Sequence, residues 1–142
     1  MKTLKILFLF LALTTASPVF SQWTTAELSQ ARWDLSTAIA GDKVFFAGGK
    51  VLNGGTVAPS TRIDIYNRTT ANWTTHELSQ ARSEIYAFTL GDKILFCGGS
   101  RPGTSPSNRV DIYTNTTDTW STASLTISRF PMAVIAHNGK LL

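Results

Sequence analysis

The sequence is poor in the residues that build most catalytic and metal sites. It has one cysteine, Cys97, and two histidines, His76 and His137. A single cysteine cannot supply the disulfide framework of a small exported domain, so packing must provide the stability. No Cys/His spacing suits zinc, no glycine-rich loop precedes a helix, and no G-x-S-x-G elbow is present. The sequence therefore predicts no metal, no cofactor and no catalytic residue.

Charge is also scarce, at 15% of 142 residues, beside 43% hydrophobic and 11% aromatic residues. This composition is globular and excludes disordered, collagen-like and coiled-coil chains. The formal net charge of +4 falls to +2 without residues 1–21, which hold two lysines and no acid. Such a small charge gives no reason to predict a nucleic-acid partner. No segment after residue 21 has a convincing helical period.

The N-terminal segment has the pattern of a secretory signal peptide. Lys2 and Lys5 precede eight apolar residues at 6–13, and small and polar residues follow. Eight residues cannot span a hydrocarbon core, which needs about 20 helical residues. We predict cleavage after Ser21, and cleavage after Ala16 is the second choice. The alternative to a signal peptide is that this apolar segment forms a buried core helix. The mature protein is expected to be secreted or periplasmic, with no stable membrane span.

An internal repeat organises the rest of the chain. Residues 23–49 match residues 73–99 at 15 of 27 positions without a gap. The tryptophans that begin successive copies are 50 and 47 residues apart, and the difference lies in one loop, 50–61 against 100–108. A third copy begins at Trp120. A period near 50 residues is typical of propellers and other repeat architectures.

Each repeat reads as four short strands. In the first full copy these are residues 35–40, 44–47, 62–66 and 73–78; in the second they are 85–90, 94–97, 109–113 and 120–125. Continuous apolar runs at 44–47 and 94–97 predict strands buried on both faces. Asn/Thr-rich stretches at 67–72 and 114–119 predict turns. Four strands in about 50 residues predict an all-β fold made of propeller blades.

The repeat resembles the kelch family in its double glycine after a buried strand, followed by a Tyr and then a Trp. The residues that carry this pattern are Gly48, Gly49, Tyr66 and Trp73, then Gly98, Gly99, Tyr113 and Trp120. The resemblance implies antiparallel four-stranded blades: blade one at about 32–78, blade two at about 82–125, and the start of a third at 129–142. The aromatic residues would fill the space between sheets.

By the same resemblance, residues 22–142 are a partial propeller, because 4–8 blades are needed to close the ring. Residues 23–28 match the outer strand of a closing blade, whose other strands would come from C-terminal blades that this chain lacks. The side faces of the blades that are present would stay open. We therefore expect the chain to associate through apolar faces and unpaired edges.

Three arginines occupy the same position in successive repeats, just before the first (inner) strand of each blade: Arg32, Arg82 and Arg129. In a closed propeller they would form a partial ring of positive charge, able to hold an acidic ligand. The alternative is that each pairs with a nearby acid or carbonyl, Asp34 and Glu84 being the nearest acids. His76 is expected to face solvent and His137 to lie in a loop.

The leading hypothesis is an exported binding or scaffold module that recognises a protein or carbohydrate through its variable loops. The kelch resemblance also permits an enzyme fragment, either a copper oxidase of the galactose oxidase type or a sialic acid mutarotase. The oxidase requires Tyr and His copper ligands and a Cys joined to a Tyr. Cys97 lies in a predicted buried strand and is a poor candidate for that link, so the sequence favours binding over catalysis.

Overall fold

The computed structural model describes residues 25–130 and two short strands near the C-terminus, 136–137 and 140–141. The predicted signal peptide and its cleavage site lie outside these residues. Apart from one short 3-10 helix, η1 (Pro102–Thr104), every regular element of the described part is a β-strand. The all-β prediction is confirmed. No helix in the described part is long and apolar enough to cross a membrane.

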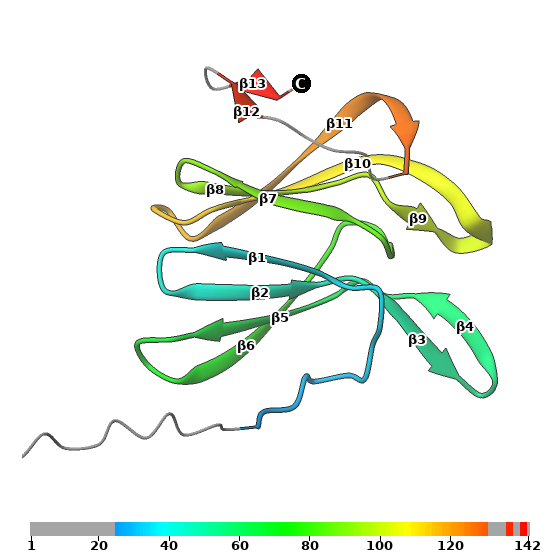
Figure 1. The fold of residues 1–142 in the computed structure, drawn as a ribbon, viewed down its shortest axis with the longest axis horizontal. Coiled ribbons are helices and arrows are strands. Elements are labelled where there is room, and N and C mark those ends of the chain that lie inside the picture. Colours follow the sequence, from blue (N-terminus) through cyan, green and yellow to red (C-terminus); the bar gives the residue numbers. More distant parts are fainter. Residues whose placement is uncertain (1–24, 131–135, 138–139, 142) are drawn as a thin grey trace, which may run out of the picture.

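Two antiparallel sheets stand side by side, one of four strands and one of four strands with a short fifth, β9 (Ser100–Arg101), attached to it (Figure 1). The strands of the first sheet, in spatial order, are β1 (Ser36–Ala40), β2 (Lys43–Ala47), β5 (Arg62–Asn67) and β6 (Asn72–Glu77). The strands of the second sheet, in the same spatial order, are β7 (Tyr86–Leu90), β8 (Lys93–Cys97), β10 (Ser105–Thr114) and β11 (Thr119–Arg129). These strands fall where the sequence repeat predicts them, and neighbouring strands within each sheet run antiparallel.

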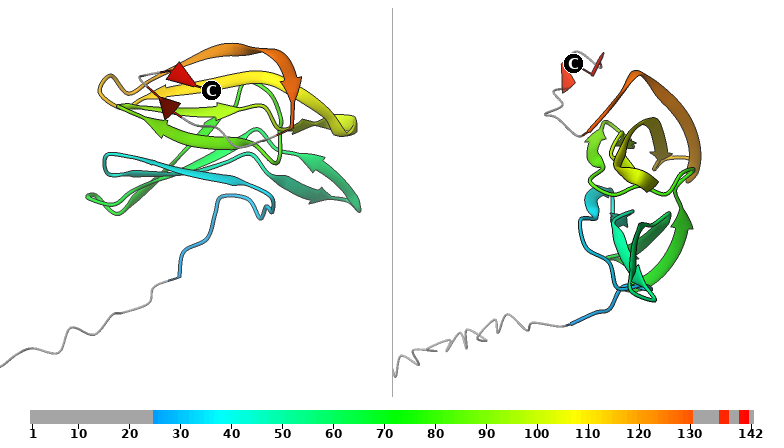
Figure 2. Two further views of the ribbon diagram at one scale, coloured as in Figure 1. Left: turned by 45° about the horizontal axis from the view of Figure 1, so that its top comes forward. Right: turned by 90° about the vertical axis from the view of Figure 1, so that its right-hand side faces the viewer.

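The loops between the second and third strands fold differently in the two sheets. In the first sheet this loop forms a separate hairpin of β3 (Lys50–Asn53) and β4 (Thr56–Pro59), with one bridge from Lys50 to Trp33 at its base. In the second sheet it forms β9 (Ser100–Arg101) and η1, and β9 pairs with the beginning of β10. The repeat is therefore regular in its sheets and variable at one end (Figures 1 and 2).

The ends of the repeat pattern differ from the prediction. Strand β11 continues to Arg129, which pairs with Ser107 beyond a register shift, because β10 begins early enough to offer partners. Residues 25–28 form no strand, and Trp23 lies outside the described residues, so the closing strand at 23–28 stays a prediction. Beyond Arg129, β12 (Ala136–His137) and β13 (Lys140–Leu141) form a short hairpin, so the prediction that His137 lies in a loop is wrong.

The two faces of each sheet are chemically different. In the first sheet, Lys43 lies on the same face as Phe45 and Ala47; we call this the Lys face, and its equivalent in the second sheet begins with Lys93. The opposite face carries Tyr66 and Trp73 in the first sheet, and their equivalents in the second; we call it the Tyr–Trp face.

The core lies where the Lys face of the first sheet meets the Tyr–Trp face of the second. Phe45 is fully buried there, with its ring centroid 4.8 Å from Tyr113, 6.2 Å from Trp120 and 6.3 Å from Phe96. His76 stacks on Trp120 at 4.3 Å. The prediction that His76 faces solvent is therefore wrong, because its strand position points it at the neighbouring sheet.

We predict that Phe45→Ala lowers the free energy of unfolding by about 3–5 kcal/mol, because it leaves a cavity among three aromatic rings. Phe46→Ala, one position along β2, is the control and should cost less, since Phe46 is only partly buried and packs on the open Tyr–Trp face. Urea unfolding followed by tryptophan fluorescence measures both. Equal losses would contradict the placement of the core between the sheets.

Candidate functional site

Arg82 lies in the segment 78–85 that joins β6 to β7, which we call the link between the sheets. Its side chain is completely buried. One guanidinium nitrogen donates to the carbonyl oxygens of Gly98 at 2.7 Å and Arg109 at 2.8 Å. The other pairs with the carboxylate of Asp111, which is also buried. Burial lowers the pKa of Arg82, and Asp111 opposes that shift. A planar five-donor group thus holds the link against the end of β8 and the middle of β10.

Arg32 repeats this arrangement in the first sheet. Its side chain is fully buried and pairs with Asp64, while its nitrogens donate to the carbonyls of Arg62 and Phe46. The second carboxylate oxygen of Asp64 accepts the backbone N–H of Ser29 at 3.1 Å. The two arginines therefore hold the incoming chain segment against each sheet in the same way.

These contacts differ from the exposed arginine ring that the sequence suggested as a ligand site. Arg32 and Arg82 offer no guanidinium to solution, whereas Arg129 is exposed at the end of β11. In the described part of the chain the three side chains do not form one charged rim. Arg32 and Arg82 instead follow the alternative interpretation, because their partners are carbonyls and acids.

The acids nearest in sequence are not those partners. Asp34 and Glu84 both accept from Lys50, each at 2.8 Å, in an exposed cluster. Hydrogen bonds to these two carboxylates raise the pKa of Lys50. Asp34 and Glu84 both have positive φ, 53° and 52°, a backbone conformation that is uncommon outside glycine.

The double glycine makes room for the same link. Gly48 and Gly49 have φ of 62° and 97°, and the Gly49 N–H donates to the carbonyl of Arg82 at 3.0 Å. A Cβ on Gly48 would lie 2.6 Å from Ile85 Cδ1 and still closer to the Arg82 carbonyl. Gly98 stands in the same relation to the carbonyl of Arg129. The glycines are therefore required by the passage of the next link across the sheet end.

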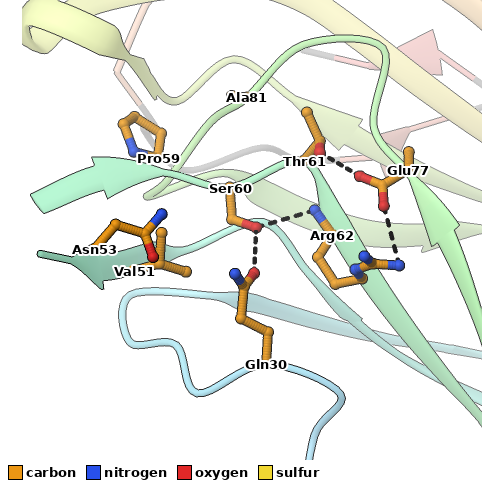
Figure 3. A pocket seen from close by; sticks show the side chains of 9 residues that line it. All are labelled: Gln30, Val51, Asn53, Pro59, Ser60, Thr61, Arg62, Glu77 and Ala81. Atoms are coloured by element: carbon orange, nitrogen blue, oxygen red, sulfur yellow. Dashed lines mark hydrogen bonds and ion pairs between the residues drawn. The ribbon is translucent and has the colours of Figure 1, made fainter.

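A polar pocket of about 260 Å³ opens at this end of the first sheet, between the β3–β4 hairpin and the link (Figure 3). It is lined by Gln30, Val51, Asn53, Pro59, Ser60, Thr61, Arg62, Glu77 and Ala81. Its size is below the usual range for a whole small-molecule site, about 300–1,000 Å³. It therefore suits one polar group, such as a sugar ring or a peptide side chain.

Hydrogen bonds within the pocket fix its walls. The Ser60 hydroxyl donates to the Gln30 amide oxygen at 3.1 Å and accepts the Arg62 N–H at 3.1 Å. Arg62 and Glu77 form an ion pair at 3.1 Å, and the Thr61 hydroxyl donates to Glu77 (Figure 3). The wall thus presents amide, guanidinium and carboxylate groups in fixed positions at a surface open to solvent.

Sequence reasoning named one part of this site, the loop 50–61, and missed the rest. Gln30 comes from a distant segment, yet the repeat held a signal, because Gln80 occupies the equivalent position. Gln80 accepts the same hydrogen bond in the second sheet, from the Ser107 hydroxyl at 2.7 Å. The other loop, 100–108, is taken up by β9, η1 and the start of β10. Among the described residues no three His, Cys, Asp or Glu side chains are grouped as metal ligands.

No protein-family model matches this chain, and no curated protein matches it.

We predict that Asp111→Asn destabilises the protein by about 3–5 kcal/mol, because it leaves the buried Arg82 guanidinium without its counter-charge. Asp34→Asn is the control, since the exposed Asp34–Lys50 pair contributes at most about 1 kcal/mol. Chemical denaturation of both variants measures the difference. A small effect at Asp111 would show that the guanidinium is held by the carbonyls alone.

Cys97 supplies a pH-dependent prediction. Burial raises the pKa of its thiol from 9.0 to about 11. The folded state keeps the proton that the unfolded state releases, so this stabilising contribution is complete below pH 9 and is lost between pH 9 and 11. Ala47 occupies the equivalent position, so Cys97→Ala is the matched variant and should lose stability less steeply over that interval. Parallel pH profiles for the two proteins would contradict the burial.

Proposed function

We propose that this protein is an exported kelch-type β-propeller module, incomplete in this chain, that binds a protein or carbohydrate ligand without catalysis. Its two sheets have the strand order and antiparallel pairing that the kelch resemblance implies. The double glycines end β2 and β8 in both copies, and the Tyr and Trp of each copy are opposite each other in the ladder. Export rests on the pattern of residues 1–21.

The observation that carries the binding proposal is the polar pocket beside a hairpin that contributes nothing to either sheet. Its strands pair with each other in a sheet of their own, and Lys50 at the base of the hairpin also bridges to Trp33. Its Leu52 and Val57 are more than half exposed, at 62% and 53%, beside the amide and charged groups of the pocket wall. Apolar surface next to fixed hydrogen-bonding groups is the chemistry of sugar and peptide recognition.

The pocket wall is also preorganised, because it is built on strand ends and the fastened link. Ser60 N–H donates to the Gly49 carbonyl, and the Ser60 carbonyl accepts the Arg82 N–H at 3.1 Å. A rigid wall lowers the entropy lost on binding. A ligand at this site would contact the hairpin, the end of β5 and the link together.

The test is binding of the purified protein to glycan and peptide arrays, followed by calorimetry on the best hit. We predict that Gln30→Ala and Asn53→Ala each weaken that binding roughly five-fold or more, the value of about 1 kcal/mol for one hydrogen bond. Gln80→Ala is the matched control, because it removes the equivalent hydrogen bond in the second sheet.

Three results would count against the proposal. One is an absence of any hit on both arrays. Another is an equal loss of affinity in Gln30→Ala and Gln80→Ala, which would locate the effect in stability. The third is turnover of a sugar substrate, which would favour an enzyme over a binding module.

A further inference from the structure

The Tyr–Trp face occurs twice, covered in the second sheet and open in the first. In the second sheet Phe96 and Tyr113 are 0% and 1% exposed, because the first sheet packs on them. In the first sheet the equivalent Phe46 and Tyr66 are only partly buried, and Trp73 is 38% exposed. Tyr66 and Phe46 both pack on Trp73, with ring centroids 5.0 Å and 5.7 Å from the Trp73 centroid. An aromatic face of this kind, left open, indicates an interaction surface.

The surface that covers such a face is shown inside the molecule. It is the Lys face of the first sheet, where Phe45, Ile63 and Ile65 are buried against the second sheet. The second sheet carries its own Lys face, on the side away from the first. That face holds an apolar cluster of Leu95, Cys97 and Val110, with Phe88, Leu90, Ile112 and Leu125 partly buried around it.

Part of this second Lys face is open. Ala123 lies opposite Val110 in the ladder and is exposed on β11, next to the partly buried Leu125. The β12–β13 hairpin lies on this side of the second sheet (Figures 1 and 2). The surface over β11 is therefore the part of the face that a partner can reach in the described structure.

A polar contact accompanies the apolar one. Lys43, on the Lys face of the first sheet, donates to the Tyr113 hydroxyl and to Asp118, each at 2.7 Å. Burial disfavours the charge on Lys43, but these two bonds outweigh it and raise its pKa. In the repeat, Lys93 is equivalent to Lys43 and Tyr66 is equivalent to Tyr113. The Lys93 side chain is 47% exposed, and Tyr66 lies on the open face. They are a donor and an acceptor on opposite outer surfaces of one chain.

We propose that two copies of this chain associate head to tail, the Tyr–Trp face of the first sheet of one copy docking on the Lys face of the second sheet of the other. The contact would use the open part of the Lys face, over β11, since Leu95, Cys97 and Val110 are already buried within each copy. Lys93 of one copy would then donate to the Tyr66 hydroxyl of the next. Because the two faces are unlike, the interface is heterologous and each copy offers one of each. This proposal stands independently of ligand binding at the pocket.

Packing of two identical Tyr–Trp faces is the competing arrangement. It would bring Tyr66 against its own counterpart, with no lysine at the position that Lys43 takes inside the molecule. The internal interface therefore favours contact between unlike faces. The two arrangements give different results in a mixing experiment.

The experiment uses the full chain and two variants that each close one face with a buried charge. Trp73→Glu closes the Tyr–Trp face, and Ala123→Glu closes the open part of the Lys face. Sedimentation velocity should show concentration-dependent association of the wild-type protein and a monomer for each variant alone. A one-to-one mixture of the two variants should form a heterodimer, because each retains the face that the other has lost.

Thr56→Glu is the control, since it adds the same charge on the exposed β3–β4 hairpin and should associate as the wild type does. Far-UV circular dichroism and thermal melting establish that each variant is folded. Tyr66→Phe should weaken association roughly five-fold through loss of one hydrogen bond. A wild-type protein that stays monomeric at about 100 μM, a concentration at which weak protein pairs associate, would overturn the proposal. So would dimers of Ala123→Glu alone, which indicate packing of like faces, or a mixture that stays monomeric.

Discussion

The structure depends on one residue that is bonded to both sheets. The carbonyl of Arg82 accepts the Gly49 N–H at the end of the first sheet, and its guanidinium pairs with Asp111 inside the second. A buried ion pair is costly to desolvate, and hydrogen bonds from the guanidinium to the carbonyls of Gly98 and Arg109 compensate part of that cost. With the link fixed in this way, β7 comes to lie beside β1, and Phe45 meets the aromatic face of its neighbour.

Much of the fold could be predicted from the repeat alone. Turn residues and apolar runs at fixed spacing locate the eight sheet strands to within a residue or two, except that β10 begins and β11 ends about four residues beyond the expected bounds. The spacing could not show which way a side chain faces across a gap between sheets. His76 illustrates this limit, because its neighbour Trp120 belongs to the next repeat. A substitution confined to one copy looks like surface variation until the second sheet is in place.

The local sequence pattern could not predict the ion-pair partners of the arginines, for a different reason. Asp64 and Asp111 lie 32 and 29 residues after Arg32 and Arg82, whereas Asp34 and Glu84 lie two residues after them. A physical signal was nevertheless present, since each distant acid stands between two apolar residues of a predicted strand. A carboxylate in the middle of a buried strand requires a cation, and the repeated arginine is the cation that recurs with it.

The self-contained hairpin has a consequence for how such a chain can change. Strands β3 and β4 pair with each other, with a bridge from Lys50 to Trp33 at the base of the hairpin. A Cβ added to Gly54 or Gly55, in the turn that joins the strands, would meet no atom within 4 Å. Loop length can therefore vary here at little thermodynamic cost. The two copies already differ by three residues in this loop. The hairpin tip is a natural point for insertion or grafting, where new surface chemistry can be acquired while the fastened link keeps the sheets in place.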